Sequence, residues 1–294
     1  MNAPTHSYLD LLASARQRNQ TYVPPTAAER ETFGRAARSL LDAIVAGGDL
    51  APVRNEFSRL ELELAWTELG GHRAVAIVEQ PDHRRGRGFY VVRCGAVASP
   101  DVIQIPHSFH DEGTLPIGRA VAEFGAWALF VNTVHRYPQG VSPAAGNSED
   151  DSESPQDLAH RSDTIWQTMT EALLERRADL TIIQVHGFAD GADPGRHDAL
   201  AILSAGKVAN GAARVAQVTR RLRALFDPEL VLQYPDTTRV LGGTKNAQGA
   251  MLRARGAGSL VHVELSRTLR QRLTHDDALL ARFAEALAQG GPTR

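Results

Sequence analysis

The chain has 294 residues, 43% of them hydrophobic, with a formal net charge of −2 at pH 7. This length suffices for one large core, or for a core with a smaller companion domain, and the balanced charge excludes a general attraction to nucleic acid or anionic membranes. No apolar run approaches the ~18 residues of a membrane-spanning helix, and the start lacks the pattern of a secretory signal, so we expect a cytoplasmic protein. The single cysteine, Cys94, cannot form an internal disulfide and is expected to pack at a strand.

Residues 1–100 predict a smaller N-terminal α+β region. Thr26 and Glu29 form a capping-box pattern, after which apolar residues recur at helical spacing until Gly47. Two apolar runs, 74–79 and 88–93, flank a polar, basic segment and are typical of two strands joined by a turn. We expect a solvated turn, and contact with an acidic partner is the alternative.

From residue 101 onward, apolar runs alternate with helical patterns. This alternation predicts an α/β catalytic domain over residues 101–294, with a mainly parallel or mixed sheet flanked by helices. The polar, acidic segment 142–157 is expected to be a flexible loop of that domain. The expected strands are 102–105, 128–131, 180–185, 230–233 and 260–263, and the expected helices are 116–125, 161–177, 211–226, 245–255 and 276–289.

Three segments at strand ends carry side chains that bind metals or transfer protons: IPHSFHDE (105–112), QVHGF (184–188) and VHVELSR (261–267). Open α/β sheets place their active sites at the carboxyl ends of strands. A catalytic zinc site commonly uses two histidines and one carboxylate as ligands, with a further carboxylate nearby as general base. The three segments supply residues of these types.

His107 and His186 are the expected imidazole ligands, because each follows a buried strand that aims its side chain out of the sheet. A histidine that only packs in the core is the alternative for each. Glu112 is the expected carboxylate ligand, since a short loop can fold it back toward His107. Asp111 and, after it, His110 are the alternatives, because spacing alone does not fix the geometry of that loop.

Glu264 is the expected general base. Its apolar strand would otherwise bury an unpaired carboxylate, which is costly without a cation or hydrogen-bond partner. In this role Glu264 takes the proton of the attacking water and delivers it to the leaving amine. A salt bridge to Arg267 or Arg270 is the alternative.

Arg136 and His135, which follow the strand 128–131, carry the substrate prediction. Arg136 is suited to bind a substrate carboxylate bidentately, and His135 to polarise the scissile carbonyl. His160 and Arg161 are further candidates, and each of these residues alone is also compatible with a surface position. Together they favour a small acidic acyl-amino acid or peptide as substrate.

Four features follow one another along residues 101–272: His107 to Glu112 followed by Gly-Thr, the pair His186-Gly187, the stretch GGTKN at 242–246, and Glu264 followed by Leu-Ser-Arg. In order and spacing they resemble zinc-dependent amidohydrolases and peptidases with a carboxypeptidase-like core, most closely the phage-type poly-γ-glutamate hydrolase branch. N-formylglutamate amidohydrolases are similar too, in a Pro-His opening and a later strand-end His. The poly-γ-glutamate hydrolase branch has HGGG where this chain has HSFH at 107–110, and residues 1–100 have no counterpart in that branch.

The resemblance implies a phosphorylase/hydrolase-like α/β fold, with zinc held by His107, Glu112 and His186 and with Glu264 as the catalytic carboxylate. The prediction is therefore a zinc-dependent amidohydrolase or metallopeptidase that cleaves an amide bond in an acidic N-acyl amino acid or a γ-glutamyl-type peptide. One alternative is a peptidoglycan amidase or peptidase, against which the missing export signal counts. The other is a binding or effector module that keeps the fold without catalysis.

Overall fold

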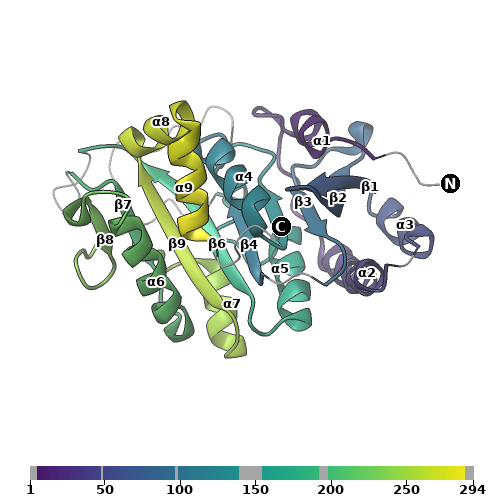
Figure 1. Ribbon diagram of the computed structural model, residues 1–294. Helices are drawn as coiled ribbons and strands as arrows, with labels where there is room; N and C mark the ends of the chain where they lie inside the picture. Colours follow the sequence, from purple (N-terminus) through teal and green to yellow (C-terminus); the bar gives the residue numbers. More distant parts are fainter. Residues whose placement is uncertain (1–4, 48, 97–98, 139–153, 192–197, 289–294) are drawn as a thin grey trace. The chain divides into compact units, whose positions relative to one another are not determined.

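The computed structural model describes residues 5–47, 49–96, 99–138, 154–191 and 198–288 (Figure 1). The chain forms two compact units, each built from separate stretches of the sequence. The first unit comprises Met1–Val97, Pro106–His110 and Ala128–Arg176, and the second comprises Ala98–Ile105, Asp111–Trp127 and Arg177–Arg294. The predicted N-terminal region falls almost entirely in the first unit, and the functional boundary at residue 100 stays a prediction.

The described part of the first unit contains four antiparallel strands in the order β1 (Leu62–Leu69), β2 (His72–Glu79), β3 (Phe89–Arg93) and β5 (Ala128–Val131). Helix α1 (Tyr8–Ala15) contacts β1, β2 and β3, whereas α2 (Ala27–Val45) packs against α3 (Ala51–Ser58) and α5 (Ile165–Arg176). Aromatic rings fill the core between these elements. Phe130 meets Tyr90 and Trp166 edge to face, with centroids 4.9 and 5.4 Å apart.

Two local predictions for this unit are confirmed. The capping box at the start of α2 is present, because Thr26 Oγ1 accepts from Glu29 N at 3.2 Å and Glu29 Oε2 accepts from Thr26 N at 2.7 Å. Strands β2 and β3 pair as the expected hairpin, with Ala74 opposite Arg93.

The basic segment between β2 and β3 differs from the expected solvated turn. The carboxylate of Glu79, which is buried, accepts from the backbone N–H groups of Arg85, Gly86 and Arg87 at 2.9, 3.0 and 3.3 Å. The side chains of Arg85 and Arg87 both pair with Glu29. The segment folds around a buried carboxylate, and its arginines have partners within the first unit.

The second unit is a mixed α/β layer structure, which confirms the expected fold class. Its described strands follow the order β4 (Asp101–Ile105), β6 (Thr181–Phe188), β9 (Ser259–Ser266), β7 (Ala201–Ser204) and β8 (Val231–Gln233). Strands β4, β6 and β9 are parallel, β7 is antiparallel to β9, and β8 is parallel to β7.

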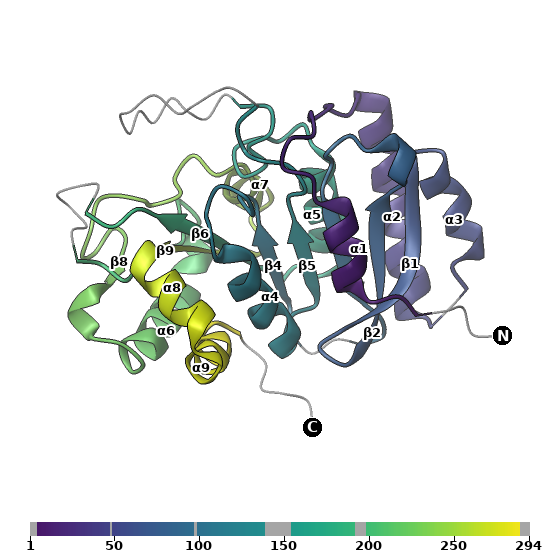
Figure 2. The ribbon, with the colours of Figure 1, turned by 90° about the horizontal axis from the view of Figure 1, so that it is seen from above.

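Helices cover both faces of this sheet. Figure 2 shows α7 (Ala247–Arg255) on one side of β6 and β9, with α8 (Arg267–His275) and α9 (Asp277–Leu287) on the other. Helices α4 (Thr114–Gly125) and α6 (Ala212–Arg223) both contact α9. Short 3-10 turns lie at Pro81–His83 in the first unit and at Ala209–Gly211 and Pro228–Leu230 in the second.

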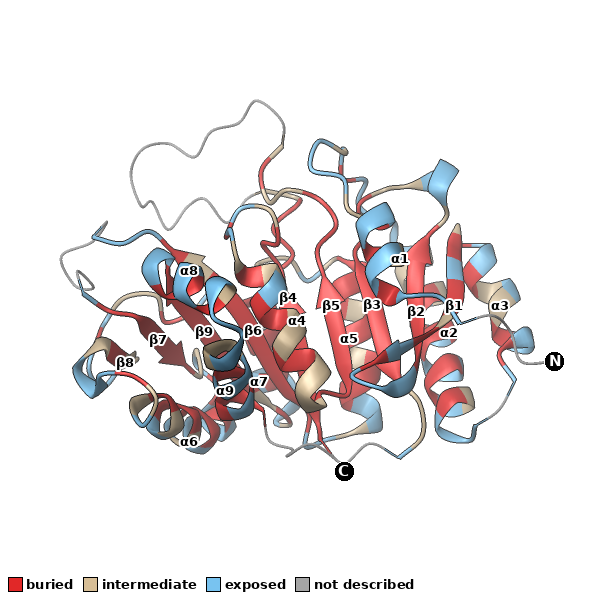
Figure 3. Cartoon of the chain, turned by 45° about the horizontal axis from the view of Figure 1, so that its top comes forward, coloured by how far each residue is buried: buried red, intermediate tan, exposed pale blue. Residues whose placement is uncertain are grey.

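Side chains alternate between the two faces of β6 and β9, and this gives the sheet of the second unit one apolar face and one polar face. The strands are buried almost throughout, while the helices keep exposed outer faces (Figure 3). Ile103 and Ile105 face α4, where the Cβ of any larger residue at Gly118 would meet Ile105 at 2.6 Å. By strand register the apolar Ile183 and Val263 share that side, so the polar residues of β6 and β9 point toward α7.

Several elements depart from the sequence expectation. Strand β5 pairs antiparallel with β3 in the first unit. Strand β7 was not expected, and neither was helix α8 (RTLRQRLTH), which has few apolar positions. Residues 142–153 of the acidic segment lie outside the described residues. Its remaining part packs, since Gln156 and Asp157 are buried. No helix among the described residues is long and apolar enough to cross a membrane.

Candidate metal and catalytic site

A row of buried polar side chains crosses the face of the second unit's sheet that α7 covers. Strand register places one residue from each of four strands at the same level: Gln104, Gln184, His262 and Ser204. One step closer to the carboxyl ends, His186 of β6 lies opposite Glu264 of β9. All of these side chains share one face because residues two apart on a strand point the same way.

His186, His262 and Glu264 form a compact, buried group. Their ligand atoms lie within 4.8 Å of one another. The two imidazole rings are stacked at a tilt, with centroids 4.5 Å apart, and His262 Nε2 lies 3.8 Å from Glu264 Oε1. Two imidazoles and one carboxylate are donors that zinc and related metals accept.

Asp111 lies beside this group. Its Oδ2 is 3.8 Å from His186 Nδ1 and accepts from Gly187 N at 3.0 Å. Asp111 is buried, whereas the side chain of Glu112 is 86% exposed and its carboxylate lies 3.8 Å from Arg267. The structure therefore places Asp111, the alternative carboxylate, next to His186, in place of the expected Glu112.

The turn before α4 explains this difference. Thr114 donates to the backbone oxygen of Asp111 through both its N–H, at 3.1 Å, and its hydroxyl, at 2.7 Å. Gly113 adopts a positive φ of 88° as the residue that precedes α4, a conformation that favours glycine. This turn directs Asp111 inward and Glu112 toward solvent.

Arg270 binds the backbone around these groups. Its buried guanidinium donates from Nε to Glu112 O at 2.5 Å and from Nη1 to Phe188 O at 3.2 Å, and Nη1 also donates to Leu265 O. A Cβ on Gly187 would lie 2.1 Å from Nη1, so glycine is required for this close approach.

The charge of Arg270 acts on both buried carboxylates. Burial lowers the pKa of Arg270, and Asp111 and Glu264 oppose that shift by favouring the charged guanidinium. Arg267, the other residue that the sequence offered as a partner of Glu264, instead lies next to Glu112.

The GGTKN stretch at 242–246 packs over His262. Gly243 has a φ of 58°, and a Cβ at this position would meet the His262 ring at 2.8 Å. Ser204 Oγ donates to Gly242 O at 2.6 Å. The glycines thus allow the backbone to approach the polar row closely.

A second buried cluster lies in the first unit and centres on Asp157. Its Oδ1 is 2.9 Å from His107 Nε2, and its Oδ2 contacts Arg136 Nη2 and lies 3.1 Å from His160 Nδ1. Burial opposes ionisation, but His107, His160 and Arg136 outweigh it and hold the pKa of Asp157 well below its usual range. These partners explain why the end of the acidic segment packs.

Asn132, at the end of β5, brings the parts of this cluster together. Its Nδ2 donates to Pro106 O at 2.8 Å and to Gln156 O at 3.1 Å, so it joins the segments that carry His107 and Asp157. Sequence reasoning gave Asn132 no role.

His135 lies in an aromatic environment in the first unit. Its Nδ1 lies 3.2 Å from both the backbone nitrogen and the backbone oxygen of Tyr137, and its ring centroid lies 5.4 Å from that of His110. Burial lowers the pKa of His135, which favours the neutral ring. Arg161 pairs with Asp163 at 2.8 Å.

The predicted residues thus fall into two groups, with His107, His135 and Arg136 in the first unit and Glu112, His186 and Glu264 in the second. Sequence reasoning missed His262 and Asp157. His262 had a usable signal, because it precedes Glu264 by two positions on one strand and must share its face. Asp157 had none, since it ends a segment whose composition indicated a loop.

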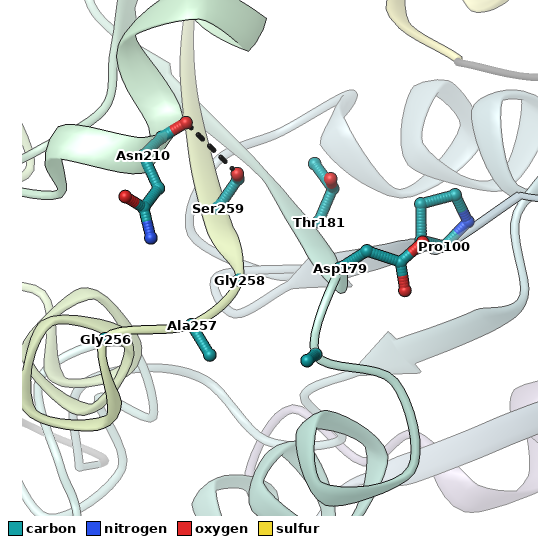
Figure 4. A pocket seen from close by; sticks show the side chains of 9 residues that line it. Pro100, Asp179, Thr181, Asn210, Gly256, Ala257, Gly258 and Ser259 are labelled. Carbon is teal, nitrogen blue, oxygen red and sulfur yellow. Dashed lines mark hydrogen bonds between the residues drawn. The ribbon is translucent and has the colours of Figure 1, made fainter.

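A separate open hollow of about 420 Å³ lies at the amino ends of β6 and β9 (Figure 4). Within this hollow, Ser259 donates to Asn210 O at 3.4 Å. The carboxylate of Asp179, which also lines the hollow, is paired with Arg177 at 2.8 and 3.0 Å. The hollow is at the opposite end of these strands from His186 and Glu264, so it is not part of the candidate site.

No model of a known protein family matches the chain, and no curated protein matches it in sequence. Among solved structures, it is similar to the N-formylglutamate amidohydrolase from Ralstonia eutropha, with 17% identity, a TM-score of 0.38, and coverage of 65% of this chain and 95% of that one. A bacteriophage poly-γ-glutamate hydrolase matches with 16% identity and a TM-score of 0.39 over 67% and 86%. A metallo-carboxypeptidase from Pseudomonas aeruginosa matches with 13% identity and a TM-score of 0.39 over 80% and 68%.

Proposed function

We propose that the chain is a zinc-dependent amide hydrolase. The observation that carries the proposal is the pair formed by His186 Nδ1 and Asp111 Oδ2, both buried and 3.8 Å apart, with Glu264 beside them. This separation is too long for a hydrogen bond. It is close to the ~3.3 Å between two ligands that each lie ~2 Å from one tetrahedral zinc.

The charges around the pair also fit a cation. Asp111 and Glu264 are two buried carboxylates, and both favour the charged form of the Arg270 guanidinium. Buried negative charge is costly unless positive charge compensates it. A mixed set of imidazole and carboxylate donors is one that zinc accepts readily.

His186 and Asp111 would hold the metal, and His107 remains the proposed third ligand. His107 precedes Asp111 by four positions in the sequence. Its Nε2 is bound to the Asp157 carboxylate, which is how proteins commonly orient a metal-binding imidazole through its other nitrogen. We therefore replace Glu112 by Asp111 in the ligand set that the sequence predicted.

When bound, zinc would polarise the scissile carbonyl and make water a better nucleophile. Glu264 would take the proton of the attacking water and return it to the leaving amine nitrogen. Arg270, which contacts the backbone at the ends of β6 and β9, keeps the strand ends in register for this transfer.

Arg136 and His135 remain the proposed substrate-binding residues. A guanidinium has five N–H donors, so the contact of Arg136 with Asp157 is compatible with binding a substrate carboxylate as well. A neutral imidazole carries one N–H donor, so His135 is suited to bind a carbonyl oxygen. This pair favours a small acidic N-acyl amino acid or a γ-glutamyl-type peptide.

The test combines metal analysis with a substrate screen of N-acyl glutamates and γ-glutamyl peptides. Purified protein should hold about one zinc per chain. His186→Ala should lose zinc and activity together, whereas Glu264→Gln should keep zinc and lose at least ~100-fold in turnover. Glu112→Gln, which changes an exposed carboxylate of the adjacent turn, is the control and should keep both. A fully metallated His186→Ala protein, or a fully active Glu264→Gln protein, would contradict the proposal.

A further inference from the structure

A chain of buried side-chain amides leads to His186 in the second unit. Gln184 Nε2 donates to Gln104 Oε1 and to Gln248 Oε1, both at 2.8 Å. Gln184 Oε1 accepts from Asn246 Nδ2 at 2.6 Å and lies 3.2 Å from His186 Nε2. All five side chains are buried.

The backbone fixes the direction of every hydrogen bond in this chain. Asn246 is the N-cap of α7, and its Oδ1 accepts from Gly249 N at 2.9 Å. A backbone N–H can only donate, so the oxygen of the Asn246 amide must face Gly249 and its NH₂ group must face Gln184. The Gln184 atom that meets this NH₂ group is therefore the carbonyl oxygen.

His186 must donate to that same oxygen. Gln184 Oε1 can only accept, so the proton of the neutral His186 ring lies on Nε2. The other ring nitrogen, Nδ1, then carries a lone pair and faces Asp111 Oδ2 at 3.8 Å. A lone pair and a carboxylate repel each other in a buried site unless a cation lies with them.

The amide of Gln184 cannot turn over at low cost. Both of its N–H groups and its oxygen have partners, so a flip would place its oxygen against two carbonyl oxygens and its NH₂ group against that of Asn246. Unmatched polar groups are especially unfavourable where no water can replace the lost bonds.

We propose that Asn246 and Gln184 are positioning residues that hold the His186 proton on Nε2 and thereby present Nδ1 to the metal. The inference rests on the proposed metal-dependent function. It assigns a role to the GGTKN stretch, whose last residue is Asn246, and to polar positions of β6 that have no part in the chemistry itself.

Two variants of equal charge separate this role from a general need for packing. In Asn246→Asp, the carboxylate still accepts from Gly249 N, but it offers Gln184 an acceptor in place of a donor. Gln184 then turns its NH₂ group toward the new carboxylate and His186, the amides of Gln104 and Gln248 turn with it so that they donate to Gln184, and the His186 ring proton moves to Nδ1. In Gln184→Glu, one oxygen of the new carboxylate still accepts from both Asn246 and His186 Nε2, and the other accepts from Gln104 and Gln248 once their amides have turned. This control adds the same charge and keeps the proton where it was.

The direct measurement is the ring tautomer of His186 in metal-free protein labelled with ¹⁵N-histidine. Two-bond ¹⁵N–¹H correlations at about pH 8, where an ordinary imidazole is neutral, report which nitrogen carries the proton. The His186 signals are assigned from their loss in His186→Gln. Zinc affinity is measured in parallel by competition with a chromophoric chelator.

We expect Nε2–H in the wild type and in Gln184→Glu, and Nδ1–H in Asn246→Asp with zinc affinity lowered about 10- to 100-fold. A wild-type ring with its proton on Nδ1 overturns the inference even if Asn246→Asp fails to fold. An unchanged tautomer in folded Asn246→Asp also overturns it. If the tautomers follow the expectation but the wild type binds no zinc, the proton assignment stands and the proposed function fails.

Discussion

Replacing Gly187 by alanine tests whether Arg270 holds the carboxyl ends of β6 and β9 together. A Cβ at this position would lie 2.1 Å from Arg270 Nη1 and 2.4 Å from Cζ. An arginine side chain is flexible and normally moves aside at little cost. Here its guanidinium is buried and donates to the backbone oxygens of Glu112, Phe188 and Leu265, so moving it breaks hydrogen bonds.

The size of the effect follows from the two bonds that Nη1 makes, to Phe188 and Leu265. Hydrogen bonds to charged groups contribute about 1.5–3 kcal/mol each. If the guanidinium regains part of this by shifting toward solvent, the free energy of unfolding should fall by about 2–4 kcal/mol. For a chain of 294 residues that unfolds in one step, this lowers the melting temperature by about 3–7 °C.

The assay is thermal and denaturant unfolding of Gly187→Ala, Arg270→Met and the double variant. If the clash with the guanidinium is the cause, Gly187→Ala should cost less than ~1 kcal/mol once Arg270 is methionine. Gly34→Ala is the control, because a Cβ there meets only Thr168 and Arg38, at 3.2 Å or more, and alanine favours the helix. An equal cost of Gly187→Ala in both backgrounds would refute the reasoning.

Two further predictions concern the ligand turn and the cysteine. Asp111→Ala should lower zinc affinity at least ~10-fold more than Glu112→Ala in a chelator competition, because Asp111 is buried beside His186 and Glu112 is exposed. The reverse order would return the ligand role to Glu112. Cys94 should alkylate slowly at about pH 8, because burial raises the pKa of its thiol to about 11 and only the thiolate reacts. Its rate should rise with pH up to about that value, and fast alkylation at neutral pH would show that the pKa of the thiol is not raised in solution.

The strand-end positions could be predicted from the sequence because their signal is local. The runs before His186 and around Glu264 are apolar enough to indicate buried strands, and parallel strands bring their carboxyl ends to one edge. The structure places His186 directly opposite Glu264 in the β6–β9 register. No property of either segment alone specifies that register.

The choice between Asp111 and Glu112 could not be predicted in the same way. It depends on the turn that ends at Gly113 and on Arg270, which donates to Glu112 O from 158 positions later in the chain. The packing of Asp157 depends likewise on His107, which precedes it by 50 positions. Composition indicated a loop because it averages over a segment, whereas one buried carboxylate needs only a few well-placed partners.

The chain of buried side-chain amides in the second unit is hard to explain by its contribution to the free energy of unfolding. Burying the amides of Gln104, Gln184, Gln248 and Asn246 removes them from water, and their mutual hydrogen bonds roughly offset that loss. Apolar side chains of similar volume would serve a buried strand at least as well. An apolar row, however, cannot specify which nitrogen of a neighbouring imidazole carries the proton. A row of amides anchored to one backbone N–H can do so, and for that reason we attribute the row to the presentation of His186 and not to the stability of the core.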